Sequence, residues 1–179
     1  MVYFLRHGET LWNKTEKWQG ISDIDLSNKG ILQAQEVAHH LSKVKLTKIF
    51  SSDLKRASKT AEIISELFQL EVLTDIRLRE RNLGQFEGLT TSEISKLFKR
   101  QLDILDIVSM DFPEFGVEPL ESEFSRARDF IEDLKAFGRD DILVVSHGIT
   151  IAIMVSILTG NDFRSRKIGN CEIIEVNLN

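Results

Sequence analysis

Two histidines in this sequence stand at the same kind of junction, between a short apolar run and a glycine. Residues 2–5 lead into Arg6-His7-Gly8, and residues 142–145 lead into Ser146-His147-Gly148. Each apolar run is typical of a buried strand, and the residues after each glycine read as the start of a helix. A glycine there lets the backbone approach a ligand closely, and the first N–H groups of a helix favour an anion. The two histidines are therefore candidates for an anion site at the end of a sheet.

A third apolar run, residues 48–50, is also followed by polar residues and an expected helix, and that helix contains Arg56. It is followed by Ser51-Ser52-Asp53, which places Arg56 in the first turn of the next expected helix. Because ligands of open α/β sheets bind beyond the carboxyl ends of the strands, we expect Arg6, Arg56 and the two histidines to meet at one edge. Arginine suits a phosphoryl group, since its planar fork pairs with two oxygens and stays charged.

These residue types fit phosphoryl transfer to a histidine. A transferred phosphoryl group spreads its charge over three oxygens, so the site must supply cations and in-line positioning. A neutral ring nitrogen of one histidine can attack phosphorus, and neighbouring arginines favour that neutral form by lowering the histidine pKa. The second histidine can donate a hydrogen bond to the charge that develops. The leaving oxygen needs a proton, and we expect Glu80, kept protonated in a desolvated site, to supply it.

Simpler interpretations of the same residues remain open. A histidine at the end of a strand is often a hydrogen-bonded core residue, and the Arg79-Glu80-Arg81 triplet could be an ion-pair cluster on the surface. A zinc site on His7 and His147 is the chemical rival, although two arginines would repel the cation and no cysteine pair or His-Glu motif accompanies them. Trp12 and Trp18 flank the expected phosphate loop, either as packing residues or as a wall for the substrate.

The elements that must position these residues alternate between short strands and longer helices. The expected strands are residues 2–5, 48–50, 71–73, 142–145 and 173–176. The expected helices, with apolar residues at three- and four-residue spacing, are residues 28–44 (with Ser27 as N-cap), 53–67, 121–137 and 148–158. This alternation predicts an α/β fold, a three-layer α/β/α sandwich with a mainly parallel sheet. No repeat or linker divides residues 1–179, so we expect a single domain.

Residues 82–119 interrupt this alternation, because they read as short helices and irregular chain without a strand. Both prolines lie in this stretch, along with Phe98, Phe112 and Phe115. We expect a small helical insertion that covers one edge of the sheet as a lid, because long insertions of this kind are usually functional. The phenylalanines would either line a pocket or hold the lid down.

The composition excludes several classes of function. Of 179 residues, 42% are hydrophobic and 28% are charged, which supports a buried core and excludes a disordered or fibrous chain. The formal net charge of −5 lacks the basic excess of nucleic-acid-binding domains, so no nucleic-acid partner is expected. The single cysteine, Cys171, permits no internal disulfide. Because neither a signal-peptide pattern nor an apolar run of roughly 20 residues is present, we expect a soluble, cytoplasmic protein without a membrane partner. A homodimer stays open.

A series of short motifs runs along nearly the whole chain. The first is Phe4-Leu5-Arg6-His7-Gly8-Glu9-Thr10, followed by Trp12-Asn13. The others, in order, are Gln19-Gly20, Asp25-Leu26-Ser27 with Gly30, Ser51-Ser52-Asp53-Leu54 with Arg56-Ala57 and Thr60-Ala61, Leu78-Arg79-Glu80 with Gly84 and Phe86-Glu87-Gly88, and Val144-Val145-Ser146-His147-Gly148. An Arg-His-Gly triplet alone is weak evidence, but the whole series in this order resembles the histidine phosphatase superfamily, in its phosphoglycerate-mutase-like branch. Relatives often have Gly-Glu-Ser where this chain has Leu120-Glu121-Ser122.

That resemblance implies a phosphohistidine mechanism with no metal or other cofactor. His7 would be the nucleophile that becomes phosphorylated, and Glu80 would protonate the leaving group and then activate water. The residues implied to bind the phosphoryl oxygens or to form the phosphate loop are Arg6, Asn13, Gln19, Gly20, Arg56, His147 and Gly148. The fold implied is the same three-layer α/β/α arrangement that the strand and helix pattern predicts.

The resembling enzymes are hydrolases and mutases, which would share these residues and differ in how they hold the rest of the substrate. A mutase must retain a doubly charged phosphoglycerate, which demands extra cations in the lid. Residues 98–119 carry Lys99 and Arg100 against five acidic residues, Asp103, Asp106, Asp111, Glu114 and Glu118. The chain is also shorter than the mutases it resembles. We therefore expect a phosphomonoester hydrolase that resembles broad-specificity phosphatases and α-ribazole phosphatase more than true mutases.

The partner would be a small phosphorylated metabolite, with α-ribazole phosphate, a sugar phosphate, a nucleotide monophosphate and a phosphoglycerate all open. A phosphoglycerate mutase is the alternative activity. A non-catalytic regulator that binds a phosphorylated ligand is the alternative from another class. Such a regulator is expected to have lost a catalytic residue, and this sequence retains His7, Glu80 and His147.

Overall fold

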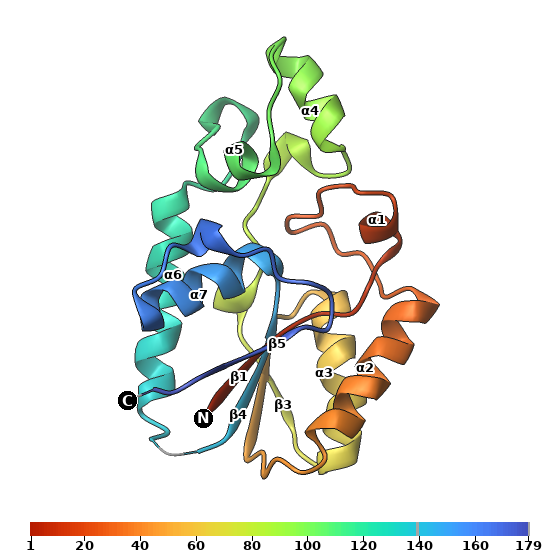
Figure 1. Cartoon of the computed structure of the whole chain (residues 1–179), viewed down its shortest axis with the longest axis vertical. Helices are drawn as coiled ribbons and strands as arrows, with labels where there is room; N and C mark the ends of the chain where they lie inside the picture. Colours follow the sequence, from red (N-terminus) through yellow and green to blue (C-terminus); the bar gives the residue numbers. More distant parts are fainter. Residues whose placement is uncertain (139, 179) are drawn as a thin grey trace.

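Within residues 1–138 and 140–178, which this computed structural model describes, five strands form one central sheet (Figure 1). The strands are β1 (Val2–Arg6), β2 (Lys48–Ser51), β3 (Val72–Thr74), β4 (Ile142–Ser146) and β5 (Ile173–Val176), in the spatial order β3-β2-β4-β1-β5. Strands β1 to β4 are parallel, and β5 is antiparallel beside β1. The predicted mainly parallel sheet is confirmed, and each expected strand lies within one residue of the observed one.

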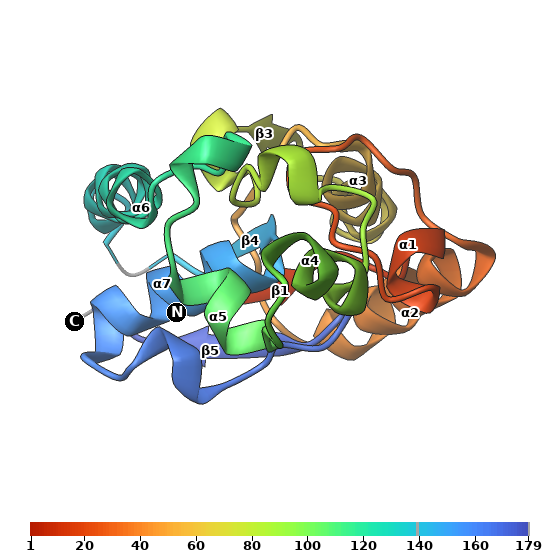
Figure 2. The same cartoon turned by 90° about the horizontal axis from the view of Figure 1, so that it is seen from above.

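Helices cover both faces of the sheet (Figures 1 and 2). On one face lie α2 (Asn28–Leu41) and α3 (Lys55–Phe68), and on the other lie α6 (Leu120–Lys135) and α7 (Gly148–Thr159). The side chains of β1 alternate accordingly, because successive residues of a strand point to opposite faces. Val2 and Phe4 pack with α6 and α7, whereas Tyr3 and Leu5 pack with α2 and α3. The predicted three-layer α/β/α sandwich is confirmed.

The first long helix, α2, shows how local sequence sets the ends of an element. It begins after Ser27, whose hydroxyl accepts a hydrogen bond from the Gly30 N–H at 3.1 Å, as the predicted N-cap requires. The helix ends at Leu41, earlier than the predicted residue 44. The amides of Ser42 and Val44 bond to carbonyls three residues back, which tightens the chain into a turn before β2.

The order of the strands explains which loops meet. Strand β4 lies between β2 and β1, with Ser146 level with Arg6 and Val145 level with Ser51. The residues that follow these three carboxyl ends are therefore neighbours. The loop after β1 is held against α2 by a close backbone approach, since a Cβ on Gly8 would lie 2.5 Å from the carbonyl oxygen of Gly30.

Residues 82–119, called the lid segment below, extend beyond the carboxyl ends of the strands (Figures 1 and 2). The segment contains η2 (Gly84–Phe86), α4 (Thr91–Phe98), α5 (Ile104–Ser109) and η3 (Pro113–Phe115). Its centre is the fully buried Phe86, whose ring centroid lies 5.9, 5.1 and 5.1 Å from those of Phe98, Phe112 and Phe115. These phenylalanines form the lid segment's own core, and none of the three lines the cavity described below.

The remaining short elements lie in loops: α1 (Leu11–Lys14), η1 (Ile76–Leu78) and η4 (Phe163–Ser165). Among the described helices, none is both long enough and apolar enough to cross a membrane.

Candidate active site

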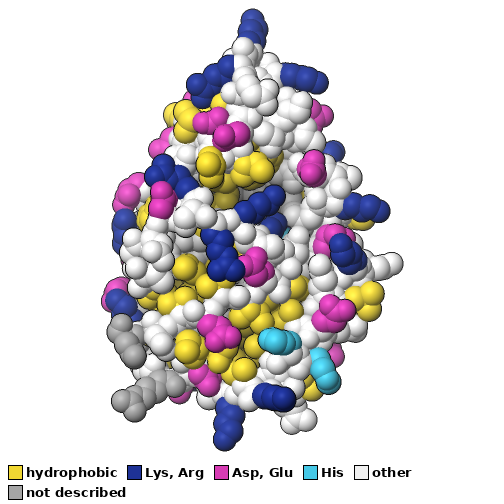
Figure 3. Space-filling view, in the orientation of Figure 1, with side chains coloured by type: hydrophobic (Ala, Val, Ile, Leu, Met, Phe, Trp, Pro, Cys, Tyr) yellow, Lys and Arg dark blue, Asp and Glu magenta, His cyan; other side chains and the backbone are white. Residues whose placement is uncertain are grey.

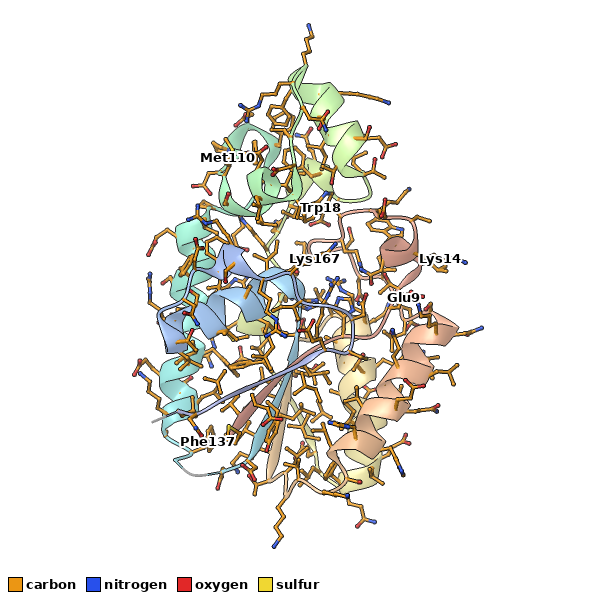
Figure 4. All side chains as sticks on the ribbon, in the orientation of Figure 1. Glu9, Lys14, Trp18, Met110, Phe137 and Lys167 are labelled. Carbon is orange, nitrogen blue, oxygen red and sulfur yellow. The ribbon has the colours of Figure 1, made fainter. Side chains whose placement is uncertain are left out.

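A cavity of about 200 Å³ lies between the carboxyl ends of the strands and the lid segment. In Figure 3 basic side chains gather in this region, with hydrophobic side chains above them. Figure 4 shows Trp18 and Lys167 at the same place, between the lid segment and the body of the molecule. The predicted site residues that line the cavity are Arg6, His7, Asn13, Gln19, Gly20, Arg56, Glu80 and Gly148.

His7 follows β1 directly and is 2% exposed. Its Nδ1 lies 2.7 Å from the carbonyl oxygen of Gly8. A carbonyl can only accept, so this contact assigns the ring proton to Nδ1 and leaves a lone pair on Nε2. Burial, and then the positive charges of Arg56 and Arg6, lower the pKa of His7 well below its usual value. The ring is therefore neutral and nucleophilic at neutral pH.

Arg56 lies in the first turn of α3, as predicted, and its guanidinium is held by the loop that includes the predicted Gly20. It donates to the carbonyls of Ser22 and Gly20 at 2.6 Å each. Gly20 has a φ of +49°, and a Cβ there would lie 2.1 Å from Oε1 of Glu87, so only glycine fits. Burial lowers the pKa of Arg56 to about 10, which leaves it charged at neutral pH.

Arg6 is the second cation beside His7. One of its terminal nitrogens donates to the carbonyl of Ile168 at 2.6 Å. Its Nε is buried and has no hydrogen-bond partner among the described residues. Burial is the main cause that lowers the pKa of Arg6. An unpaired buried donor is costly in free energy, and Arg6 is among the residues that line the cavity.

His147 lies beside this pair but behind the cavity surface. Its ring centroid is 5.2 Å from that of His7, and the residue is fully buried. Its Nδ1 accepts a hydrogen bond from Nε of Arg56 at 3.2 Å, so Nε2 carries the proton and donates to the Ser52 hydroxyl at 2.9 Å. Burial, followed by the charge of Arg56, lowers the pKa of His147 well below its usual value. Both ring nitrogens thus bond to protein groups, and a direct contact between His147 and a phosphoryl group stays a prediction.

Glu80 receives hydrogen bonds from the start of α7. The amides of Ile149 and Thr150 donate to its two oxygens at 3.2 Å each, and the Thr150 hydroxyl lies 3.1 Å from Oε1. The side chains next to Glu80 point elsewhere: Arg79 pairs with Asp53, and Arg81 is fully buried. The triplet is therefore not one surface ion-pair cluster, and Glu80 alone of the three lines the cavity described here. Its protonation stays a prediction.

Asn13 and Gln19 are tied to each other through Thr10. The Thr10 hydroxyl lies 3.1 Å from both Asn13 Oδ1 and Gln19 Oε1, and the Thr10 N–H donates to Asn13 Oδ1 at 3.0 Å. With its oxygen engaged in this way, Asn13 offers its Nδ2 hydrogens to other groups.

The side of the cavity that faces the lid segment differs from what the charges of that segment suggested. From the lid segment come the apolar side chains of Ile104, Leu105 and Val108, and no acidic residue of its described chain lines the cavity. The additional cations come from outside the lid segment, and they are Lys17, Arg164, Arg166 and Lys167. The sequence analysis counted cations in the lid segment alone and so did not anticipate these, because residues 164–167 fold back over the site from the far end of the chain.

Two other residues around the site were given no site role in the sequence analysis, although Thr60 belongs to its motif series. The Asn170 side chain donates to the carbonyl of His7 at 3.0 Å and to Asn13 Oδ1 at 3.2 Å. The Thr60 hydroxyl accepts from the Gly8 N–H at 3.1 Å. Thr60 lies one turn after Arg56 on α3, a spacing that points both residues to the same side and could have revealed it. No pattern in the sequence connects Asn170 to His7.

The described residues contain no group of three or more side chains from His, Cys, Asp and Glu that could hold a metal ion. His7 and His147 face guanidinium groups rather than acidic side chains. The expected independence from metals remains to be tested with a chelator.

Comparisons with known proteins find the same kind of relative along nearly the whole chain. Residues 2–179 match the family model described as the histidine phosphatase superfamily, branch 1. A phosphoglycerate mutase-like protein of Arabidopsis thaliana is 40% identical over 152 residues, which cover 82% of this chain and 66% of that protein, just under two thirds of its length. A probable phosphoglycerate mutase of Escherichia coli is 36% identical over 182 residues, covering 98% of this chain and 83% of that protein. The solved structure of a mycobacterial glucosyl-3-phosphoglycerate phosphatase superposes with a TM-score of 0.83 at 28% identity, covering 96% of this chain and 87% of that one.

Proposed function

This chain belongs to branch 1 of the histidine phosphatase superfamily, and we propose that it is a phosphomonoester hydrolase that acts through a phosphohistidine on His7. The observation that carries the proposal is the state of His7. It is a buried, neutral imidazole with Nδ1 held by the Gly8 carbonyl, which leaves Nε2 as the nucleophile, and its charged neighbours are Arg6 and Arg56. A site that binds the three phosphoryl oxygens with guanidinium groups and presents a nitrogen lone pair is suited to in-line phosphoryl transfer.

The first half-reaction transfers the phosphoryl group to the protein. Nε2 of His7 attacks phosphorus, the bond from phosphorus to the ester oxygen breaks, and Glu80 gives its proton to that oxygen. Arg6 and Arg56 stabilise the charge on the three equatorial oxygens, with Asn13 assisting. The alcohol then leaves the cavity.

The second half-reaction restores the enzyme. Water attacks phosphorus on the side opposite the imidazole, Glu80 accepts one of its protons, and the bond from phosphorus to Nε2 breaks. Inorganic phosphate leaves, and Glu80 has regained the proton that it gave up. The cycle consumes one ester and one water, and it requires no cofactor.

The first experiment is a phosphate-release assay on a panel of esters in the presence of EDTA. The panel holds 3-phosphoglycerate, glucosyl-3-phosphoglycerate, α-ribazole phosphate, nucleotide monophosphates and nitrophenyl phosphate. We expect the wild-type protein to hydrolyse at least one ester and His7→Ala to lose that activity at least about a thousandfold while its thermal unfolding stays cooperative. Normal turnover by the alanine variant, or inhibition by EDTA that added metal reverses, would contradict the proposal.

Glu80→Gln tests the acid in the same assay. We expect it to slow esters with poor leaving groups far more than nitrophenyl phosphate, whose leaving oxygen needs little help from a proton. Equal losses on both kinds of ester would mean that Glu80 only supports the start of α7.

A second candidate activity, phosphoglycerate mutase, is favoured by one observation. Lys17, Arg164, Arg166 and Lys167 line the cavity and could hold a second anionic group on the substrate. Formation of 2-phosphoglycerate from 3-phosphoglycerate, followed alongside phosphate release, separates the two activities. Isomerisation faster than hydrolysis would establish the mutase. If no ester on the panel reacts, a regulator that binds a phosphorylated ligand becomes the better explanation.

A further inference from the structure

A second carboxyl group lies buried behind Glu80. Glu123, in the first turn of α6, is fully buried, and its Oε2 has no hydrogen-bond partner among the described residues. Its Oε1 lies 3.0 Å from the hydroxyl of Thr150, which is also fully buried, and the same hydroxyl lies 3.1 Å from Oε1 of Glu80. The Thr150 hydroxyl therefore bridges the two carboxyl groups.

The contacts around Thr150 favour a proton on one of these carboxyls. Its oxygen lies 2.9 Å from the carbonyl of Arg79, 3.1 Å from Glu80 and 3.0 Å from Glu123, and a hydroxyl carries one hydrogen. If both carboxyls were ionised, the Thr150 hydroxyl would face three acceptors with only one hydrogen to donate. Two negatively charged carboxylates would also lie next to the same buried oxygen. A proton on one carboxyl turns that group into a donor to Thr150 and removes the conflict.

Glu123 is the group that holds this proton, because the cations nearest to it have closer partners. Arg126 lies 3.4 Å from Oε1 of Glu123, but it donates two shorter hydrogen bonds to Glu118, at 2.9 and 3.2 Å. Arg81 pairs with Asp111 at 2.8 Å and comes no closer than 3.9 Å to Glu123. Burial, and then the negative charge of Glu80, raise the pKa of Glu123 to about 8 against the lowering effect of Arg126.

Glu80 differs from Glu123 in its surroundings. It accepts backbone hydrogen bonds from Ile149, Thr150 and Arg81. Yet the reaction in the cavity requires Glu80 to act as an acid, so a proton must reach it. Thr150 provides the route, since its oxygen can accept a proton from Glu123 while its own hydrogen passes to Glu80.

We propose that Glu123 is a positioning residue that stores one proton behind Glu80 and passes it to Glu80 through the Thr150 hydroxyl when a phosphate ester occupies the cavity. The inference rests on the proposed function, in which Glu80 protonates the leaving oxygen. The negative charge of the ester favours the proton on Glu80, so the O–H bond of Glu123 breaks, the proton binds Thr150, and the Thr150 hydrogen binds Glu80. After the leaving oxygen has taken this proton, water restores it to Glu80, and it returns to Glu123 when phosphate leaves.

Glu123→Gln tests this proposal, because the amide has the shape of the acid and can donate to Thr150 but cannot release a proton. We expect the ratio of turnover on alkyl phosphates to turnover on nitrophenyl phosphate to fall about tenfold, part of the usual effect of an acid catalyst. We also expect the alkaline limb of the pH profile of kcat/KM to move to lower pH, because Glu80 would then have to hold its proton unaided. Thr150→Val should do the same, and Thr150→Ser should restore the wild-type profile.

The matched control is Glu121→Gln, two residues away on α6, where the side chain is 78% exposed. It should leave the ratio and the pH profile unchanged, and thermal unfolding of each variant reports whether it folds. An unchanged alkaline limb in both Glu123→Gln and Thr150→Val would overturn the inference while leaving the proposed hydrolase intact.

A readout without substrate separates the two proposals. At pH 7 the infrared difference spectrum between wild type and Glu123→Gln should contain the carbonyl stretch of one protonated carboxylic acid. Its absence would overturn the stored proton, whatever the activity. If the carbonyl stretch is present but the protein hydrolyses no ester, the role of Glu123 in turnover is overturned. In that case the proposed hydrolase function fails as well.

Discussion

His7 and His147 face the same positive charges and the same lack of water, and both are neutral for that reason. They differ in what their nitrogens touch. His7 has one nitrogen bonded to the Gly8 carbonyl, whereas both nitrogens of His147 bond to Arg56 and Ser52. The contrast supports the proposal that His7 attacks phosphorus, and it is consistent with His147 orienting Arg56.

The neutral histidines predict how stability depends on pH. Because the folded-state pKa values lie below the unfolded value of 6.5, the unfolded chain binds more protons as the pH falls below 6.5. Stability from these groups is present above pH 6.5 and is lost as the pH falls below it, by up to about 1.4 kcal/mol per pH unit for each histidine. Urea unfolding between pH 7 and 5.5 should therefore show a shallower pH dependence for His7→Ala than for wild type. Identical slopes would show that His7 titrates normally in the folded protein.

The sequence analysis identified the site residues that follow strand ends, but it missed buried residues farther from the cavity, such as Glu123. Arg6, His7 and Arg56 could be predicted because an apolar run, a polar residue and a helix start fix their place at the sheet edge. Glu123 could have been noticed, because it lies one turn before Ala127 on the buried side of α6, where a charged residue is out of pattern. Phe124, the next residue and an apolar one, is only partly buried against the core.

Among the elements, the lid segment is a unit with its own core. Phe86 is fully buried at the centre of a cluster that includes Ile94, Leu102 and Ile107. This cluster is separate from the two that flank the sheet, although the partly buried Trp18 contacts both the lid cluster and the cluster of α6 and α7. Trp18 therefore both packs and lines the cavity, which combines the two roles that the sequence left open.

Phe86→Ala should destabilise the lid segment selectively. Removing a buried phenylalanine costs about 3–5 kcal/mol through lost burial and the cavity that remains. Because the cluster is local, we expect faster hydrogen exchange in residues 82–119 and unchanged protection in β1 and β4, measured by mass spectrometry.

Phe137→Ala is the matched control, since Phe137 lies at the opposite end of the molecule (Figure 4). It should leave exchange in the lid segment as in wild type. Equal loss of protection in the sheet and in the lid segment of the Phe86 variant would show that the two unfold together.

The strands and long helices could be predicted from the sequence better than the short helices of the lid segment, because only the former leave a regular apolar pattern. Strands buried on both faces, and helices with a regular apolar stripe, leave clear patterns, so their order and type could be predicted. The six-residue helix α5 presents Ile104 and Leu105 to the cavity rather than to a core, so no stripe marks its role.

At the scale of the whole molecule, the charge of the chain and the charge of its cavity have opposite signs. The formal net charge is −5, yet the cavity is lined by cations from both ends of the sequence, among them Arg6, Lys17 and Lys167. The expectation of no nucleic-acid partner rests on average charge. Average charge could not reveal this concentration of cations, because it depends on the return of residues 164–167 to the site. A local cationic region in an acidic protein attracts small anions while the rest of the surface repels large ones.

The unpaired Nε of Arg6 has a consequence for the heat resistance of the protein. The folded chain carries a buried cation whose donor lacks a partner among the described residues, and the unfolded chain does not. Inorganic phosphate that binds beside Arg6 in the cavity would bind the native state alone, so mass action would make it a stabiliser, worth about 2.7 kcal/mol at a hundred times its Kd. In a calorimetric scan this should raise Tm by roughly 5–10 °C, whereas sodium chloride of equal ionic strength should not. The melting temperature of the purified protein should therefore report the phosphate concentration around it. The link is the Arg6 side chain, which we propose binds the phosphoryl group of the substrate.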